Sequence, residues 1–176
     1  MARKRRPGPK PDQPGDVARP RAGHSSLVRR HVHLGWWWLL CFLSLGIVLE
    51  TFHGLKVGWY TNVANETRRL MWTLAHTHGT LLGLVHIAFA FTVYLFATQE
   101  SRQTRLASAC LTGAGVCMPS GFFLGGVVIY DGNPGLGVLL VPVGAVLLLA
   151  AVLSTVLGLR SATQGPDAHD NRGPDP

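Results

Sequence analysis

Four side chains with metal-binding chemistry lie near the ends of two long apolar segments. Glu50 and His53 are three residues apart, so they share one face of a helix. His76 and His78 lie near the start of the next apolar segment, at a similar depth if the two segments run antiparallel. Carboxylate and imidazole groups that converge from neighbouring helices are typical of metal centres in helix bundles. We therefore expect Glu50, His53, His76 and His78 to bind a transition metal or haem.

Only one of the two neighbouring histidines is expected to face this site. His76 and His78 are about 200° apart around a regular helix, so they cannot both point at one ion. The pattern favours His78, because His86 is eight residues further on and lies on nearly the same face. In the alternative interpretation, Glu50 accepts a hydrogen bond from a histidine and fixes the register of two helices.

His86 is a second candidate ligand, deeper in the same segment. It lies roughly 12 Å beyond His78 by helix rise. Met118, on a later segment, is expected at the same depth, and histidine with methionine is a known axial pair of haem iron. The alternatives are a pairing of His86 across a dimer axis and a hydrogen bond from His86 to a neighbouring helix.

The segments that carry these residues are long enough to cross a membrane. The chain has 176 residues, of which 47% are hydrophobic and 14% charged. A span needs about 20 apolar residues in helix. Four segments meet this requirement, and they predict an all-α fold, an integral membrane four-helix bundle in a domain over 34–159. The spans are 34–55, 75–97, 106–129 and 136–159.

The charge distribution predicts the orientation of these spans. Nine of the 16 Lys and Arg residues lie in the first 30 residues. Basic residues close to a span are retained on the cytoplasmic side, although Lys56, Arg68 and Arg69 weaken the bias. We expect a multi-pass protein of the plasma (inner) membrane with both termini cytoplasmic. The basic segment 1–30 and the segment 160–176 are expected to be disordered cytoplasmic tails, because neither can bury enough apolar area to fold.

Small residues and prolines suggest how the helices pack. Gly79 and Gly83 are spaced four apart, as in close helix contacts within membranes. Pro119 and Pro142 are expected to interrupt the third and fourth spans, because proline removes a helix hydrogen bond. The sequence DGNPG at 131–135 predicts a turn between these two spans.

One stretch supports a resemblance to a known family. The sequence AHTHGTLLGLVHIAFAF at 75–91 resembles the histidine-bearing helices of the haem-copper oxidase subunit I superfamily, particularly small bacterial members with about four spans. The resemblance implies that His76 or His78 binds haem iron or another metal. The chain departs from that family because it has no second histidine-rich helix and no identifiable proton channel. The segments NETRRLMWTLAH and GFFLGG also resemble a bacterial four-span membrane family to which no activity can be attached.

Several function classes are excluded by missing motifs. The chain has no phosphate-binding glycine loop, no GxSxG and no HExxH, so we do not expect an enzyme of the hydrolytic or nucleotide-driven classes. The cluster RKRR at 3–6 has no folded module behind it, which favours contact with the lipid bilayer over nucleic acid. Three hypotheses remain: a haem or metal-binding protein, an accessory subunit of a larger membrane complex or homo-oligomer, and a small transporter or proton-conducting element.

Overall fold

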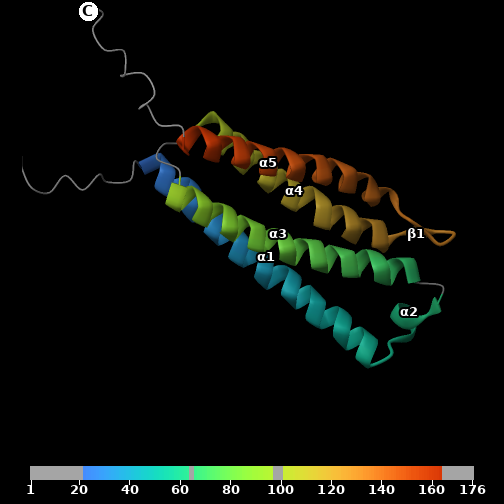
Figure 1. Cartoon of the computed structure of the whole chain (residues 1–176). Helices are drawn as coiled ribbons and strands as arrows, with labels where there is room; N and C mark the ends of the chain where they lie inside the picture. The colour runs from blue at the N-terminus through green and yellow to red at the C-terminus, as the bar shows by residue number, and fades with distance from the viewer. Residues whose placement is uncertain (1–21, 64–65, 97–100, 164–176) are drawn as a thin grey trace, which may run out of the picture.

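A computed structural model describes residues 22–63, 66–96 and 101–163, and these form a bundle of four long helices (Figure 1). This confirms the all-α four-helix bundle that the sequence predicts. A short helix and a two-stranded hairpin connect the long helices at one end. The elements are α1 (Ala22–Gly54), α2 (Gly58–Thr61), α3 (Glu66–Phe96), α4 (Arg102–Val127), β1 (Ile129–Tyr130), β2 (Asn133–Pro134), η2 (Leu136–Leu139) and α5 (Leu140–Thr163).

The distribution of apolar residues is that of a protein in lipid. Four helices are long and apolar enough to cross a membrane, with 25 to 31 residues in each candidate span. Large apolar side chains point outward, as with Leu149 at 70% exposure and Ile47 at 69%, whereas His31 and His86 in the interior are 0% exposed. Backbone groups in hydrocarbon must be satisfied internally, and helices achieve this. The chain is therefore a multi-pass membrane protein.

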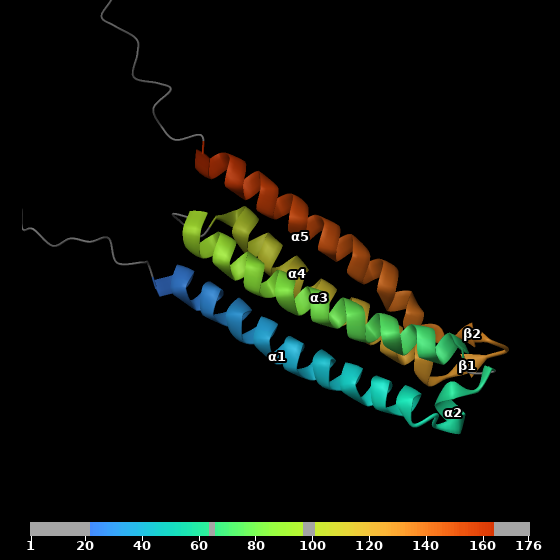
Figure 2. The same cartoon turned by 60° about the horizontal axis from the view of Figure 1, so that its bottom comes forward.

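The third helix in the chain organises the bundle. α3 packs against both α1 and α4, and α5 packs against α4. Figure 2 shows α1 and α5 on opposite sides of the α3–α4 pair. The start of α1 and the end of α5 lie at the same end of the bundle, as an even number of spans requires. α3 therefore forms contacts with α1 on one side and with α4 on another.

The structure differs from the expected spans at several helix ends and at the predicted prolines. α3 begins at Glu66, nine residues before the predicted limit of its span. α1 begins at Ala22, twelve residues before the predicted limit of the span, because the helix continues through Arg29 and Arg30 into its polar end. Pro142 lies in the first turn of α5 and does not interrupt it, so that part of the prediction was wrong. A proline in the first turn removes only an N–H group that has no partner within the helix. Pro119 lies inside α4, but the helix continues through it to Val127, so Pro119 does not interrupt its helix either.

The turn between α4 and α5 is a tight hairpin. Ile129 pairs with Pro134, and Tyr130 pairs with Asn133. The two residues between the strands, Asp131 and Gly132, both have positive φ angles, of 46° and 80°. Asp-Gly is the usual sequence of such a two-residue turn. The structure therefore confirms the predicted turn and adds a strand pair to it.

Glycine allows the backbones of α1 and α3 to come close together. A methyl group built on Gly35 would lie 2.7 Å from the carbonyl oxygen of Gly83 and 2.6 Å from Cγ1 of Ile87. Gly83 belongs to the small-residue pair that the sequence singled out, whereas its partner on α1 was not anticipated. The contact fixes how α1 lies on α3 over the half of α1 that begins at Ala22.

The Gly35–Gly83 contact predicts a specific sensitivity to substitution. Gly35→Ala forces the two backbones apart and should lower the free energy of unfolding by about 1–3 kcal/mol, the usual cost of overpacking. Gly54→Ala, on the same helix, places its methyl where no atom lies within 4 Å and should change stability by less than about 0.5 kcal/mol. Thermal unfolding in detergent, followed by tryptophan fluorescence, measures both. Equal stability of the two variants would contradict the contact.

Candidate functional site

The most buried polar group of the described chain is a pair of histidines. His31 of α1 and His86 of α3 are both 0% exposed. Their Nδ1 atoms lie 2.7 Å apart, a hydrogen bond in which one ring donates and the other accepts. The rings are stacked, with centroids 4.9 Å apart and planes inclined by 22°. Ionisable side chains at this depth are costly in a membrane protein, so they indicate function.

A serine from a third helix extends the pair. Oγ of Ser108 on α4 lies 2.7 Å from Nε2 of His31. Ser108 also lines a cavity of about 650 Å³ between α1 and α4, together with Arg30 and Arg105. The three side chains therefore form a continuous hydrogen-bonded chain from α3 through α1 to α4, next to a cavity near the end where α1 begins.

The chain of three side chains has two neutral arrangements of its protons. In the first, His86 Nδ1–H donates to His31 Nδ1, and His31 Nε2–H donates to Ser108 Oγ. In the second, Ser108 O–H donates to His31 Nε2, and His31 Nδ1–H donates to His86 Nδ1. Among the described residues, His86 Nε2 has no hydrogen-bond partner although it is fully buried. It is a free acceptor in the first arrangement and a free donor in the second.

Aromatic rings surround the pair. The Trp38 ring meets His86 edge to face, with centroids 4.9 Å apart, and Phe89 meets His31 in the same way at 4.8 Å. The far edge of the Trp38 indole rests on Gly115 of α4, where a side chain would collide with it. This apolar enclosure separates the pair from water and strengthens the hydrogen bonds within it.

Helix spacing brings the two histidines together. His31 is four residues before Gly35, so both lie on one face of α1. His86 is three residues after Gly83 and lies on the corresponding face of α3. Because the glycines touch, the histidines one turn away lie within hydrogen-bonding distance. The close backbone contact is thus the local cause of the site.

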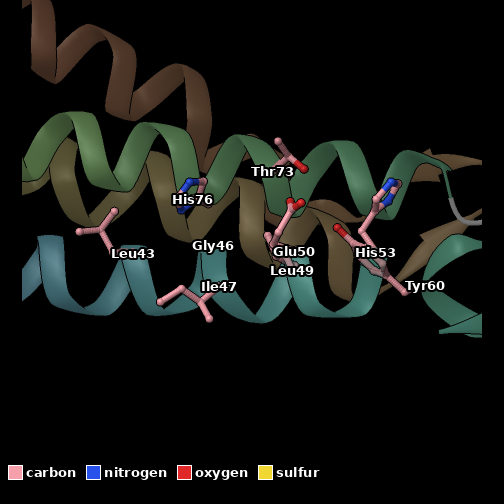
Figure 3. Close-up of a pocket in the computed structure, with 9 residues that line it drawn as sticks. All are labelled: Leu43, Gly46, Ile47, Leu49, Glu50, His53, Tyr60, Thr73 and His76. Carbon is pink, nitrogen blue, oxygen red and sulfur yellow. The ribbon is translucent and has the colours of Figure 1, made fainter. Parts of the chain in front are cut away.

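The residues that the sequence placed at the outer end are only partly together. Glu50, His53 and His76 line a cavity of about 500 Å³ between α1 and α3, with Tyr60 at its edge (Figure 3). His76 Nδ1–H donates to the carbonyl oxygen of Phe42 at 2.7 Å. Figure 3 shows the Glu50 carboxylate directed toward α3. A shared cavity with mixed acid and imidazole chemistry is therefore present at this level.

His78 lies on a different side of α3. Its ring packs on Phe122 of α4 at a centroid distance of 4.7 Å, and its Nδ1–H donates to the carbonyl oxygen of Leu74 at 2.9 Å. The sequence favoured His78 as the residue facing Glu50 and His53, and the structure places His76 there instead. The 200° separation of the two histidines is what sends them to different neighbouring helices.

The predicted metal set is not assembled. Over residues 22–63, 66–96 and 101–163, no three His, Cys, Asp or Glu side chains come close enough to bind one metal ion. Glu50, His53, His76 and His78 therefore do not form a four-ligand centre in this structure. His31 and His86 do not form a metal site between their rings either. Two nitrogens bound to a tetrahedral zinc would lie roughly 3.3 Å apart. The Nδ1 atoms of the two histidines lie 2.7 Å apart.

The proposed haem pair of His86 and Met118 is also not formed. His86 has His31 and Trp38 as its ring neighbours. The backbone and Cβ of Met118 lie against Gly144 of α5, on the side of α4 away from α1. The alternative that the sequence left open, a hydrogen bond from His86 to a neighbouring helix, is the one that the structure contains.

Two residues of the site were missed by sequence reasoning. His31 fell outside the first span because that span was started at residue 34, after the arginines. Ser108 is one of several hydroxyl residues on α4, and its sequence context does not distinguish it from Thr112. A signal for His31 did exist, because it continues the spacing of Gly35 and Leu39 along one face of α1.

Comparisons with protein-family models, with curated proteins and with solved structures found no match to this chain. The resemblance of 75–91 to the haem-copper oxidase subunit I superfamily accordingly stays an expectation from the sequence. Fold and site together define the class as a multi-pass helical membrane protein with a buried imidazole pair.

The hydrogen bond between His31 and Ser108 predicts a measurable coupling. Combining His31→Phe with Ser108→Ala in a double-mutant cycle should give a coupling energy of about 0.6–1.7 kcal/mol, the range of hydrogen bonds measured between membrane helices. Ser120→Ala is the matched control, because the Ser120 hydroxyl donates within α4 to Val116. Its coupling with His31→Phe should be near zero. Thermal unfolding of the wild type, the three single variants and the two double variants measures these energies.

Proposed function

We propose that this membrane protein relays protons through His86, His31 and Ser108. The observation that carries the proposal is the continuous hydrogen-bonded chain of three buried side chains, ending at the unpartnered Nε2 of His86. Imidazole is suited to this role, because it can accept a proton at one nitrogen and release another from the second. Of the hypotheses that the sequence allowed, the proton-conducting element is the one that this geometry favours.

The relay begins with His86 Nε2 as a free acceptor. A proton binds there, and the proton on His86 Nδ1 passes to His31 Nδ1. The proton on His31 Nε2 then passes to Ser108 Oγ, which releases its own proton into the cavity lined by Arg30 and Arg105. One proton enters and one leaves, and the chain is left in its second neutral arrangement. Reorientation of each imidazole side chain, so that its two nitrogens exchange roles, restores the original direction of the hydrogen bonds.

Trp38 is the natural gate of this relay. Its ring covers His86 on one side and rests on Gly115 on the other. Thr80 of α3 lies between His86 and the cavity of Glu50, His53 and His76, and its buried hydroxyl has no hydrogen-bond partner among the described residues. His76 is ten residues from His86 along α3, roughly 15 Å by helix rise. A proton that crosses the bundle therefore requires the Trp38 indole to move.

The orientation proposed here places the inner cavity on the cytoplasmic side. Arg30 and Arg105 lie at the end of the bundle where α1 begins. At the other end, Arg68 donates to the carbonyl oxygen of Gly126 at 3.0 Å, and Arg69 donates to that of Thr61 at 2.8 Å. Arginines that are bound to the protein's own backbone at the outer end fit the topology that the basic tail of the sequence favours.

The other hypotheses stay predictions with distinct tests. A metal bound through Glu50, His53 and His76 would have to draw together side chains that now only share a cavity. Elemental analysis of protein purified without chelators would reveal stoichiometric metal. An accessory subunit would be recovered in a larger complex after gentle solubilisation. Either result can be obtained independently of proton flux.

The proton relay predicts that flux depends on the buried pair. Purified protein in liposomes that contain a pH-sensitive dye, driven by a potassium gradient and valinomycin, should acidify or alkalinise the lumen faster than protein-free liposomes. His31→Phe and His86→Phe each break the chain and should reduce the protein-dependent rate at least tenfold. Trp38→Ala should raise it, because the ring that covers His86 is removed.

His33→Phe is the matched control for this experiment. It makes the same change on α1, two residues away, at a position that is exposed. Its rate should stay within twofold of wild type. Flux that is equal in His31→Phe and wild type would refute the relay, and so would the absence of flux from well-folded wild-type protein.

The proposed orientation predicts the labelling of single cysteines. After replacement of Cys41, Cys110 and Cys117 by alanine, Asp131→Cys in the hairpin should react with a membrane-impermeant maleimide on intact cells. Gln103→Cys, at the start of α4, should react only after the membrane is permeabilised. Both positions are exposed, so accessibility to the protein surface is matched. The reverse pattern would invert the topology.

A further inference from the structure

A groove runs along the bundle between α1 and α4. Both helices pack on α3, and two cavities lie between them. The inner cavity of about 650 Å³ contains Arg30 and Arg105, and the outer cavity of about 520 Å³ is lined by apolar side chains that include Trp38 and Phe42. Val116 lines both, so they are sections of one groove.

The inner section is strongly basic. Arg30 comes from α1 and Arg105 from α4, and both side chains are exposed. No acidic residue is among the described residues that line this cavity. Hydroxyl groups of Ser108 and Thr112 lie deeper along the same wall. Two guanidinium groups that converge from different helices, with no carboxylate between them, provide a site for an anion with several oxygen atoms.

The outer section fits a hydrocarbon chain. From Arg105 to Val116 is eleven residues of α4, roughly 16 Å by helix rise. That distance is close to half the thickness of a hydrocarbon core of about 30 Å. Val116 is 57% exposed, so its side chain forms part of the open wall of the groove. A molecule with a charged group at the arginines and a chain one leaflet long would cover the whole inner half.

We propose that the groove between α1 and α4 is a specific binding site for one anionic phospholipid. The phosphate lies between Arg30 and Arg105, and an acyl chain follows α4 past Val116 to Pro119. Basic pockets between membrane helices bind anionic head groups in this way. The lipid site shares the cavity at Ser108 with the proposed proton relay, but the observations that support the lipid site do not rest on the relay.

Binding in the groove differs from a general attraction of basic residues to the membrane surface in the arginines that it uses. Arg29 and Arg102 are also exposed, and each is close in sequence to an arginine of the site, but neither lines the cavity. A non-specific surface effect treats all four arginines alike. A site in the groove depends on Arg30 and Arg105 only. The chain thus contains its own control pair with the same charge.

Native mass spectrometry of the full chain, released from detergent with added dioleoyl phosphatidylglycerol, tests the proposal. Wild type should retain one phosphatidylglycerol, with at least tenfold preference over dioleoyl phosphatidylcholine. The double variant Arg30→Gln, Arg105→Gln should lose at least tenfold in affinity. The double variant Arg29→Gln, Arg102→Gln should stay within twofold of wild type. Thermal unfolding of both variants checks that the fold is retained.

Three results would overturn the proposal. Equal losses in the two double variants would show a non-specific charge effect. Equal binding of phosphatidylcholine would show that the groove does not select an anion. Displacement of the lipid by glycerol phosphate at matched concentration would assign the arginines to a soluble phosphate in place of a lipid.

A substitution that leaves every charge in place tests the other half of the groove. Val116→Trp fills the junction of the two cavities with a larger side chain at an exposed position. It should reduce retention of dioleoyl phosphatidylglycerol at least fivefold and have less effect on a short-chain analogue. Retention of both lipids at wild-type levels would place the acyl chain outside the groove and contradict the proposal, even if the arginine variants failed to fold.

Discussion

The close contact between Gly35 and Gly83 is the constraint on which the rest of the structure depends. It lets the backbones of α1 and α3 approach until a Cβ at Gly35 would collide with α3 and a Cβ at Gly83 would be tightly packed against α1. One turn away, the same approach places the Nδ1 atoms of His31 and His86 2.7 Å apart. Larger residues at the contact would separate the rings, and each would then need another partner in a medium that offers none.

α3 packs against both α1 and α4, and the polar groups of the bundle lie at these two contacts. Its contact with α1 holds the histidine pair toward the end where α1 begins and the cavity of Glu50, His53 and His76 toward the end where α1 finishes. Its contact with α4 brings Ser108 to the pair and leaves a groove between α1 and α4. One helix therefore positions polar groups at two depths, with the Trp38 ring between them.

The polar sites differ in how strongly the fold holds them. His31 and His86 are fully buried and bonded to each other, so their geometry is set by packing on every side. Glu50 and His53 are exposed at the end of α1, and only His76 of that group has a fixed partner, the carbonyl of Phe42. His31 and His86 therefore suit a function that needs a defined arrangement of atoms better than Glu50 and His53 do.

The sequence by itself determined the four apolar helices, the all-α bundle and the hairpin turn, and it singled out His86 as a candidate, because hydropathy, turn residues and histidines within apolar segments are local signals. The partner of His86 was not determined, since which residues of α1 and α4 meet it depends on the register of three helices. Helix rotation likewise decided that His76 and not His78 faces Glu50. Such registers are set by shape at contacts like Gly35–Gly83, and only the tertiary structure contains that information.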